Sequence, residues 1–184
     1  MIEGISHWAL AGGEKRTFAL ALDDVRRAGF AALEPAIGLD GAITVETPPE
    51  VCAAYRRAAA EAGVVVSSAA TGLTWAASAT HADAAVRRRA GALQRAALER
   101  AAWLGATAFL LVPGAVMIPW DRTYAAVRYD AAVTWAGELI AALLPDAERL
   151  GVALCVENVW NGMFYSPVEM RDFVDQFGTG RVGV

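Results

Sequence analysis

Residues 149–158 read RLGVALCVEN, and they contain the pattern on which the rest of the chain is built. A helical segment ends, Gly151 follows, and an apolar run begins. Glycine just after a helix avoids the steric penalty of the left-handed conformation in which many helices end. The run Val152–Val156 does not alternate apolar with polar residues, so both faces must be covered, as in a parallel sheet. We therefore expect a buried strand that ends at Glu157 and Asn158.

The same pattern occurs three more times, in RRAGFAALEP (26–35), AEAGVVVSSAA (60–70) and WLGATAFLLVPG (103–114). The spacing of its glycines leaves room for one strand, one helix and two loops per repeat. Regular alternation of this kind predicts an α/β fold with parallel strands, either a barrel or a doubly wound sheet. The loops after the expected strands contain neither GxGxxG nor GxxxxGK[ST], which disfavours the nucleotide-binding doubly wound folds. The expected strands are 4–8, 31–34, 64–68, 108–112, 152–156 and the start of a sixth at 182–184.

Two helix starts are marked by the same capping pattern. In SPVE (166–169), Ser166 suits the N-cap, Pro167 the first helical position and Glu169 the third. In TPPE (47–50), Thr47 is the corresponding N-cap. A longer helical pattern runs over 121–150, and the proline at 145 is expected to kink or split it.

Composition limits the class of protein. The chain has 184 residues, of which 56% are hydrophobic, and a net charge of −4. This length and composition suit one folded domain, 1–184, and the charge gives no sign of nucleic-acid binding. The amino terminus, MIEGISHWALAGGEKR, lacks the pattern of a signal peptide, and no apolar run is long enough to span a bilayer. We therefore predict a cytoplasmic protein without membrane contact.

Polar residues stand where the expected strands end, and in a parallel barrel these ends surround the mouth where active sites form. Each has a structural alternative. His7 suits a buried, hydrogen-bonded histidine, Glu34 and Ser68 can bond neighbouring backbone, and Asn158 can orient Glu157 or bond a substrate hydroxyl. Four tryptophans near these ends can pack against the core or form a wall for the apolar face of a sugar: Trp8, Trp75, Trp120 and Trp160.

Glu157 carries the strongest functional signal. A carboxylate at the end of an apolar strand loses hydration, which is unfavourable unless it is paired or binds a metal. The structural alternative is an ion pair with an arginine from a neighbouring loop. We favour the functional interpretation.

The segment VALCVENVWNGMFYSPVEMRDFVDQFGTGRVGV (152–184) resembles the sugar phosphate isomerase/epimerase superfamily, the xylose-isomerase-like TIM barrels. It looks closest to the branch of ketose 3-epimerases and hexulose-phosphate isomerases. The specific part is VEN.W followed by SP.EMRDF.D. Earlier in the chain, GISHWAL (4–10), GFAALEP (29–35) and VVVSSAATGL (64–73) are similar to the family's first three strands.

The resemblance implies a divalent metal ion, manganese, cobalt, magnesium or zinc, held at the barrel mouth by carboxylates and a histidine. Glu157 matches the glutamate that both binds the metal and exchanges a substrate proton. Glu34 matches an acidic residue of the substrate pocket, and we add His7, Ser68, Asn158 and Trp160 as candidate substrate-binding residues. Family members continue past VGV into a strand that ends in an aspartate ligand. That aspartate, the later histidine and the second catalytic glutamate have no counterparts before Val184.

We therefore expect an incomplete TIM barrel of about five strand–helix units plus the start of a sixth strand, truncated at its carboxyl end. The predicted function is a metal-dependent isomerase or epimerase that acts on a sugar or sugar phosphate through an enediolate. The alternative is a non-catalytic sugar-binding or assembly domain, or an inactive fragment of such an enzyme. Unpaired sheet edges predict self-association or binding of a missing carboxyl-terminal segment. The chain alone should have little epimerase activity.

Overall fold

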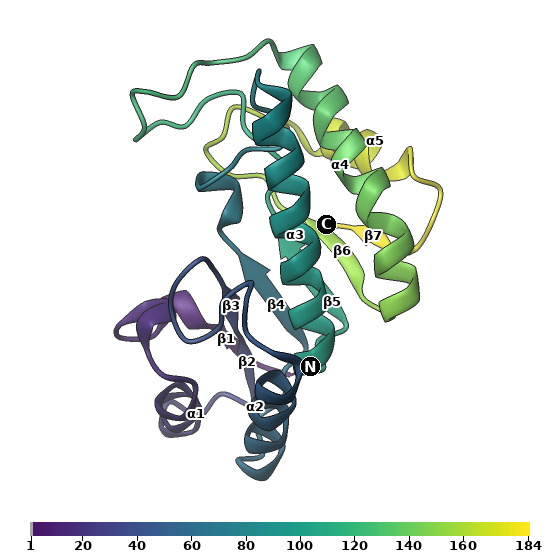
Figure 1. Cartoon of the computed structure of the whole chain (residues 1–184). Helices are drawn as coiled ribbons and strands as arrows, with labels where there is room; N and C mark the ends of the chain where they lie inside the picture. The colour runs from purple at the N-terminus through teal and green to yellow at the C-terminus, as the bar shows by residue number, and fades with distance from the viewer. Residues whose placement is uncertain (1) are drawn as a thin grey trace.

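The computed structural model describes residues 2–184 and contains five α-helices between short parallel strands (Figure 1). The strands are β1 Gly4–Ser6, β2 Ala32–Glu34, β3 Ala36–Ile37, β4 Ser68–Thr71, β5 Ala108–Leu111, β6 Ala153–Val156 and β7 Val182–Gly183. The helices are α1 Phe18–Arg27, α2 Pro49–Glu61, α3 Ala84–Leu104, α4 Tyr129–Leu150 and α5 Pro167–Asp175. Three short 3-10 turns complete the set: η1 His7–Ala9, η2 Gly13–Lys15 and η3 Leu73–Trp75.

All strand pairs are parallel, and the strands follow one another in chain order, β1-β2 and β3-β4-β5-β6-β7. β2 and β3 are two halves of one strand separated by Pro35, which has no N–H to donate to a ladder. A bridge between Ala32 and Val65 links the two groups of strands. Sequential order is that of a barrel wall, whereas a doubly wound sheet reverses its order at a switch point. The fold is therefore an incomplete barrel with five strand–helix units and a sixth strand, as the sequence predicts.

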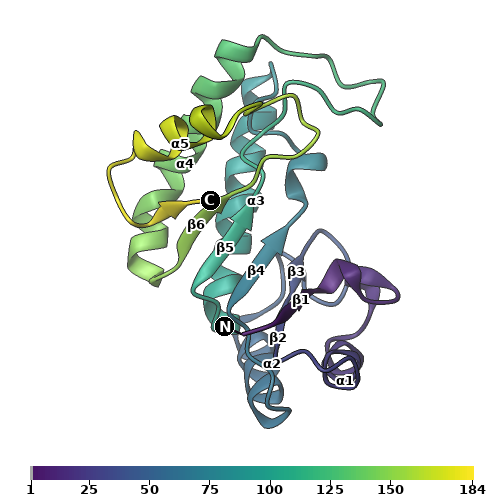
Figure 2. The same ribbon diagram turned by 180° about the vertical axis from the view of Figure 1, so that it is seen from behind.

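The two faces of this arc are covered differently. Phe109, Leu111, Leu154 and Val156 are at most 1% exposed. The residues that alternate with them, such as Leu110 and Cys155, are only half-buried. Seen from behind in Figure 2, the strands lie in front of α3, so the helix covers one face and leaves the other toward the viewer. Within residues 2–184 the concave face, which forms the interior of a closed barrel, is open.

The third predicted strand is displaced. Instead of 64–68, the strand is β4, which begins at Ser68. Val65 makes only a bridge: its N–H donates to the Ala31 carbonyl, and its own carbonyl accepts from the Leu33 N–H. The valines resemble a strand because they are β-branched, but continuous pairing starts only where Ser68 meets Ala108 of β5. The serine that we expected at a strand's carboxyl end therefore stands at its amino end.

Of the two predicted helix starts, the one at Ser166 is confirmed and the one at Thr47 is wrong. The Ser166 hydroxyl accepts the Glu169 N–H at 3.2 Å, and Pro167 is the first residue of α5. The Thr47 N-cap is wrong, because α2 begins at Pro49 and the Thr47 hydroxyl instead accepts the Thr44 N–H at 2.8 Å.

The helix that the sequence predicts over 121–150 is shorter in the structure. Residues 112–128 form a loop, and α4 starts at Tyr129. Pro145 lies within α4 and does not split it. A proline removes only one hydrogen bond, and three buried apolar residues of α4, Leu139, Ile140 and Leu143, hold the helix against the core.

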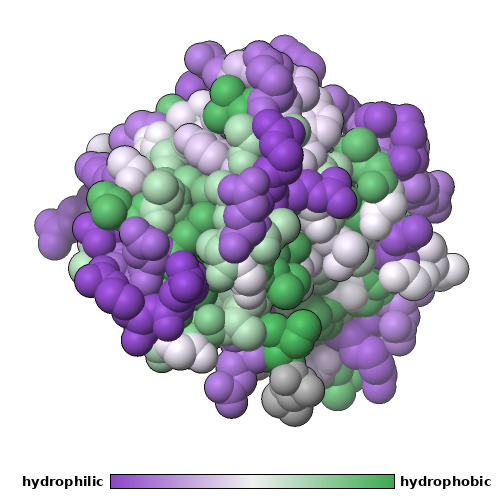
Figure 3. Space-filling view, turned by 90° about the horizontal axis from the view of Figure 1, so that it is seen from below, coloured by the Kyte–Doolittle hydropathy of each residue, from purple (hydrophilic) through white to green (hydrophobic). Residues whose placement is uncertain are grey.

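The carboxyl ends of the strands point to the top of Figure 1 and their amino ends to the bottom. Seen from below in Figure 3, hydrophobic residues reach the surface between hydrophilic ones. Exposed apolar side chains near the amino ends of strands include Ile2 and Val65, which are 61% and 43% exposed.

In residues 2–184, none of the helices combines the length and apolar character that crossing a membrane requires. That 1–184 forms one truncated domain stays a prediction.

Candidate active site

The position of Glu157 is set by β6. Its N–H donates to the Leu111 carbonyl at 3.0 Å and so continues the ladder between β5 and β6 by one residue. Successive side chains of a strand point to opposite faces, so Glu157 shares a face with Cys155 and not with the buried Val156. The carboxylate therefore extends from the concave face at the carboxyl end of its strand.

Glu157 lines a cavity of about 760 Å³ at this end of the sheet. Segments that follow five strands contribute to the lining: η1 and η2 after β1, the loop after β3, η3 after β4, and the residues directly after β5 and β6. The lining residues are Trp8, Glu14, Ala36, Ile37, Gly38, Leu39, Asp40, Thr71, Gly72, Leu73, Trp75, Ala76, Val112, Glu157 and Val159. We call this space the mouth cavity. Trp75 packs edge to face on Trp120, with ring centroids 4.8 Å apart. Two of the tryptophans considered from the sequence, Trp8 and Trp75, thus form part of the cavity wall.

The Glu157 carboxylate has no cationic partner among the described residues, and it makes no side-chain hydrogen bond with them. The alternative of an ion pair with a loop arginine is therefore not realised in residues 2–184. The pKa of Glu157 lies above its ordinary value, first because burial disfavours the charged form and second because the negative charge of Glu34 is near. A carboxyl group with a raised pKa is a stronger base when ionised, as proton abstraction requires.

Glu34 and Ser68 lie together, but not in the mouth cavity. The Ser68 hydroxyl donates to Glu34 Oε2 at 2.7 Å, and both residues line a smaller cavity of about 220 Å³ with Ser6 and Ser67. The sequence places Glu34, Ser68 and Glu157 at strand ends around one mouth, but Ser68 begins β4 and so lies lower on the sheet, and only Glu157 of the three lines the mouth cavity. Glu34 directly follows the fully buried Leu33, so its side chain points to the concave face, and its negative charge contributes to the raised pKa of Glu157.

Three other predicted residues lie away from the mouth cavity. His7 is fully buried in η1, where Nε2 lies 3.1 Å from the Arg16 carbonyl, and burial lowers its pKa. Asn158 turns to another cavity and donates from Nδ2 to the Phe164 carbonyl at 3.4 Å. Trp160 is 80% exposed. None of the three lines the mouth cavity, and their role in substrate binding stays a prediction.

Two acidic residues of the mouth cavity, Glu14 and Asp40, escaped sequence reasoning. They lie in turns and not at strand ends, and a main-chain contact brings the turns together: the Ala42 N–H donates to the Glu14 carbonyl at 2.9 Å. Gly41 has φ +102°, and a Cβ there would lie 2.7 Å from the Glu14 carbonyl oxygen. Glycine is therefore required where the two turns meet. The dipeptide Asp40-Gly41 is a turn signal, but it does not indicate what the turn touches.

Two buried polar side chains join the loops above the strands. Thr80 Oγ1 accepts the Ala115 N–H at 2.7 Å and donates to the Ala115 carbonyl at 2.6 Å. Asn161 donates from Nδ2 to the Gly114 carbonyl at 2.7 Å. The loops that follow β4, β5 and β6 are thereby held to one another at Gly114–Ala115, which limits the movement of the mouth.

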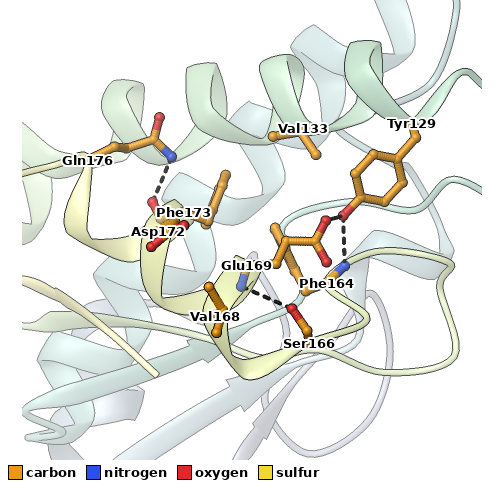
Figure 4. Close-up of a pocket in the computed structure, with 9 residues that line it drawn as sticks. All are labelled: Tyr129, Val133, Phe164, Ser166, Val168, Glu169, Asp172, Phe173 and Gln176. Carbon is orange, nitrogen blue, oxygen red and sulfur yellow. Dashed lines mark hydrogen bonds between the residues drawn. The ribbon is translucent and has the colours of Figure 1, made fainter.

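The loop after Glu157 is also held to α4 and α5. Figure 4 shows Tyr129 of α4 pointing toward Glu169 and Phe164, in a cavity of about 650 Å³. The Tyr129 hydroxyl donates to Glu169 Oε1 and accepts the Phe164 N–H at 3.2 Å. The Tyr165 N–H donates to Glu169 Oε2 at 2.8 Å. Phe164 has φ +56°, a conformation that is unfavourable for a bulky residue, so these hydrogen bonds hold a strained turn in place.

The described residues do not form a metal site by themselves. Within 2–184, no group of three or more His, Cys, Asp and Glu side chains is arranged to hold a metal ion. Divalent transition metals take four or more ligands, and Glu157 offers one carboxylate without a cation partner. The Glu157 carboxylate fits the role of one metal ligand, but the described residues do not place further ligands beside it.

Comparisons with known proteins identify the fold and the family. Residues 22–184 match a family model described as xylose isomerase-like TIM barrel. Among curated proteins, none matches. A D-psicose 3-epimerase solved in the presence of D-fructose is 22% identical, with a TM-score of 0.79 over 99% of this chain and 62% of that chain. A D-psicose 3-epimerase from Clostridium cellulolyticum H10, solved with D-tagatose, is 20% identical, with a TM-score of 0.76 and the same coverages, 99% and 62%.

A 3-keto-D-glucoside 4-epimerase from E. coli is 16% identical, with a TM-score of 0.74 over 100% of this chain and 68% of that chain. The chain thus spans 62% of the length of both D-psicose 3-epimerases. Sequential parallel strands, a strand-end glutamate at the mouth and a family match over most of the sequence lead to one conclusion: the chain belongs to the xylose isomerase-like TIM barrel family.

Proposed function

We propose that this chain forms the part of a sugar isomerase or epimerase that carries one catalytic carboxylate, Glu157. One observation carries the proposal. A half-buried carboxylate without a cationic partner among the described residues, and with a raised pKa, stands on the wall of a cavity that also contains two tryptophans. The activity belongs to a closed barrel, because this arc alone leaves one side of the cavity open to solvent.

Epimerisation beside a carbonyl begins with loss of the proton on the neighbouring carbon. In our proposal a carboxylate oxygen of Glu157 takes that proton, and the C–H electrons move into the carbonyl group to form an enediolate. An acid on the opposite side then returns a proton to the same carbon and inverts its configuration. The resemblance assigns that acid to a glutamate without a counterpart in this sequence, so Glu157 accounts for one half of the reaction.

The cavity walls suit a sugar. Trp8 and Trp75 present flat apolar surfaces on which the C–H face of a sugar ring packs. Carboxylates accept hydrogen bonds from sugar hydroxyls, and Glu14 and Asp40 bring two of them into the same cavity. The sugar would be oriented by these side chains so that the C–H beside its carbonyl faces Glu157.

We further propose that Glu157 is one ligand of a divalent metal ion, manganese, cobalt, magnesium or zinc, whose other ligands lie outside this chain. Such an ion polarises a carbonyl and stabilises an enediolate. Titration of the 184-residue chain with Mn²⁺ should therefore show only weak binding. Stoichiometric tight binding by this chain would contradict the incomplete ligand set.

The catalytic role is tested by Glu157→Gln in a barrel completed by further strands, whether these come from a longer gene product or from a second polypeptide. The amide keeps the shape of the side chain but cannot accept the proton. Turnover of a ketose should fall by at least about 100-fold, the lower range for loss of a general base. Glu61→Gln, an exposed residue of α2, is the matched control. Activity of Glu157→Gln within a few-fold of the parent would refute the assigned role.

A completed barrel that binds a ketose without any turnover would instead support the other class, a sugar-binding domain without catalysis. Exchange of the substrate C–H proton in D₂O separates the two classes directly, because only proton abstraction incorporates deuterium. The enzyme assignment predicts incorporation that Glu157→Gln abolishes.

A further inference from the structure

The charge of the mouth cavity is one-sided. Three carboxylates line it, those of Glu14, Asp40 and Glu157. Among the described residues that line it there is no lysine, arginine or histidine. The carboxylates come from three separate parts of the chain: η2, the turn after β3 and the end of β6. The cavity is therefore acidic from several sides, and Trp8 and Trp75 provide its large apolar surfaces.

A phosphate group needs the opposite environment. It carries between one and two negative charges near neutral pH, and proteins bind it with arginine, lysine or the free N–H groups at the start of a helix. No residue in the first turn of α1, α2, α3, α4 or α5 lines the mouth cavity. The helix that follows the turn of Asp40, α2, also starts with Pro48 and Pro49, which have no N–H to donate. The described part of the cavity thus lacks each of these means of binding a phosphate.

We propose that the mouth cavity takes an uncharged sugar and rejects sugar phosphates, and that Glu14 and Asp40 set this preference. This inference rests on the function proposed above and narrows its substrate class. Hydroxyl groups donate to carboxylates, whereas a phosphate is repelled by them over several ångströms. Glu14 and Asp40 are the residues to change, because Glu157 has its own role in the chemistry.

The test measures binding on the 184-residue chain, so that it does not depend on turnover. Trp8 and Trp75 provide a fluorescence signal in the cavity, and calorimetry gives a second measurement. The probes are D-fructose and D-fructose 6-phosphate at low ionic strength. We expect D-fructose to bind at least tenfold more tightly than its phosphate. Added salt should bring the two dissociation constants closer together, because salt screens the repulsion between the carboxylates and the phosphate.

The double variant Glu14→Gln and Asp40→Asn keeps the shape of the lining and removes two charges. It should reduce the ratio of the two dissociation constants at least threefold, mainly by improving phosphate binding. The matched control is Glu61→Gln, which removes a charge outside the cavity and should leave the ratio unchanged.

Three results would overturn the inference. One is phosphate binding as tight as, or tighter than, that of the free sugar, which would leave the proposed epimerase function intact. The second is an unchanged ratio in the double variant, which would show that Glu14 and Asp40 do not set the preference. The third is failure of both probes to bind at millimolar concentration, which would remove sugar selection from this chain and leave the epimerase function to the Glu157→Gln test in the completed barrel.

Discussion

Among single residues, Glu157 combines burial with an unpaired charge, and the two are in conflict. Its N–H is bonded in the β5–β6 ladder, so the main chain cannot move away to expose the carboxylate. The negative charge of Glu34 on the same face adds repulsion. A residue that disfavours the folded state in this way is typical of a functional site, because stability there is subordinate to chemistry.

This conflict predicts how stability depends on pH. Because the folded protein raises the pKa of Glu157 above its ordinary value, the folded state binds more protons than the unfolded state between the two pKa values. The free energy of unfolding therefore falls as pH rises through that window. Glu157→Gln has no such proton, so it should be more stable than the parent at pH 7 to 8, and this advantage should shrink as the pH approaches 4.5.

Urea unfolding at several pH values measures the difference. A difference between Glu157→Gln and the parent that stays constant with pH would mean that the carboxyl group titrates alike in both states.

Gly114 gives a second prediction about one residue. A Cβ at this position would lie 2.1 Å from Thr80 Cγ2, so Gly114→Ala must push Thr80 away from Ala115 and break its hydrogen bonds. We expect a loss of about 1–3 kcal/mol in the free energy of unfolding, the usual range for an overpacked core. The control is Gly180→Ala, where no atom lies within 4 Å of the added Cβ. Equal stabilities of the two variants would show that Thr80 moves without loss.

For the helices and loops, the contact between α4 and α5 determines how firmly the loop after Glu157 is held. Tyr129 of α4 is the link, because its hydroxyl bonds both Glu169 of α5 and the main chain of Phe164 (Figure 4). A helix packed on a barrel wall thus also holds part of the mouth.

Tyr129→Phe should therefore loosen this loop. The change leaves the Phe164 N–H without a partner, at a cost of about 1–3 kcal/mol in unfolding free energy. Amide hydrogen exchange in residues 157–166 should become faster. Tyr165→Phe is the matched control, because that side chain is 78% exposed. Equal exchange rates in the two variants would remove Tyr129 from this role.

For the whole molecule, the open concave face and the two outer strands are the dominant features. β1 has β2 as its only partner and β7 has β6, within the part of the chain that the structure describes. Parallel edges and half-buried apolar side chains favour association with other chains. We expect the 184-residue chain to self-associate.

Light scattering measures this directly. The average mass should exceed the 19.4 kDa of one chain and rise with concentration. Leu110→Lys places a charge on the concave face and should lower the average mass. Leu20→Lys, on an α1 side chain that is 45% exposed, should not. A monodisperse monomer at millimolar concentration would contradict the expectation.

Much of this architecture is encoded locally. The glycines that follow helices, the apolar runs and the capping residues at Ser166 depend on neighbours within a few positions, so the alternation of strands and helices follows from the sequence. Glu157 is visible for the same reason, since it directly follows an apolar strand. The family resemblance favours the barrel over the doubly wound sheet, and the strand order in the structure confirms it.

Only the tertiary structure decided which residues pair between strands and which loops contact one another. Ser68 begins β4 because its pairing with Ala108 outweighs the strand propensity of the valines before it. Glu14 and Asp40 reach the mouth cavity because two turns, distant from each other in the sequence, meet at Gly41. Strand pairing and loop contacts form between residues distant in sequence, and their geometry depends on the whole packed chain, so no local pattern contains them.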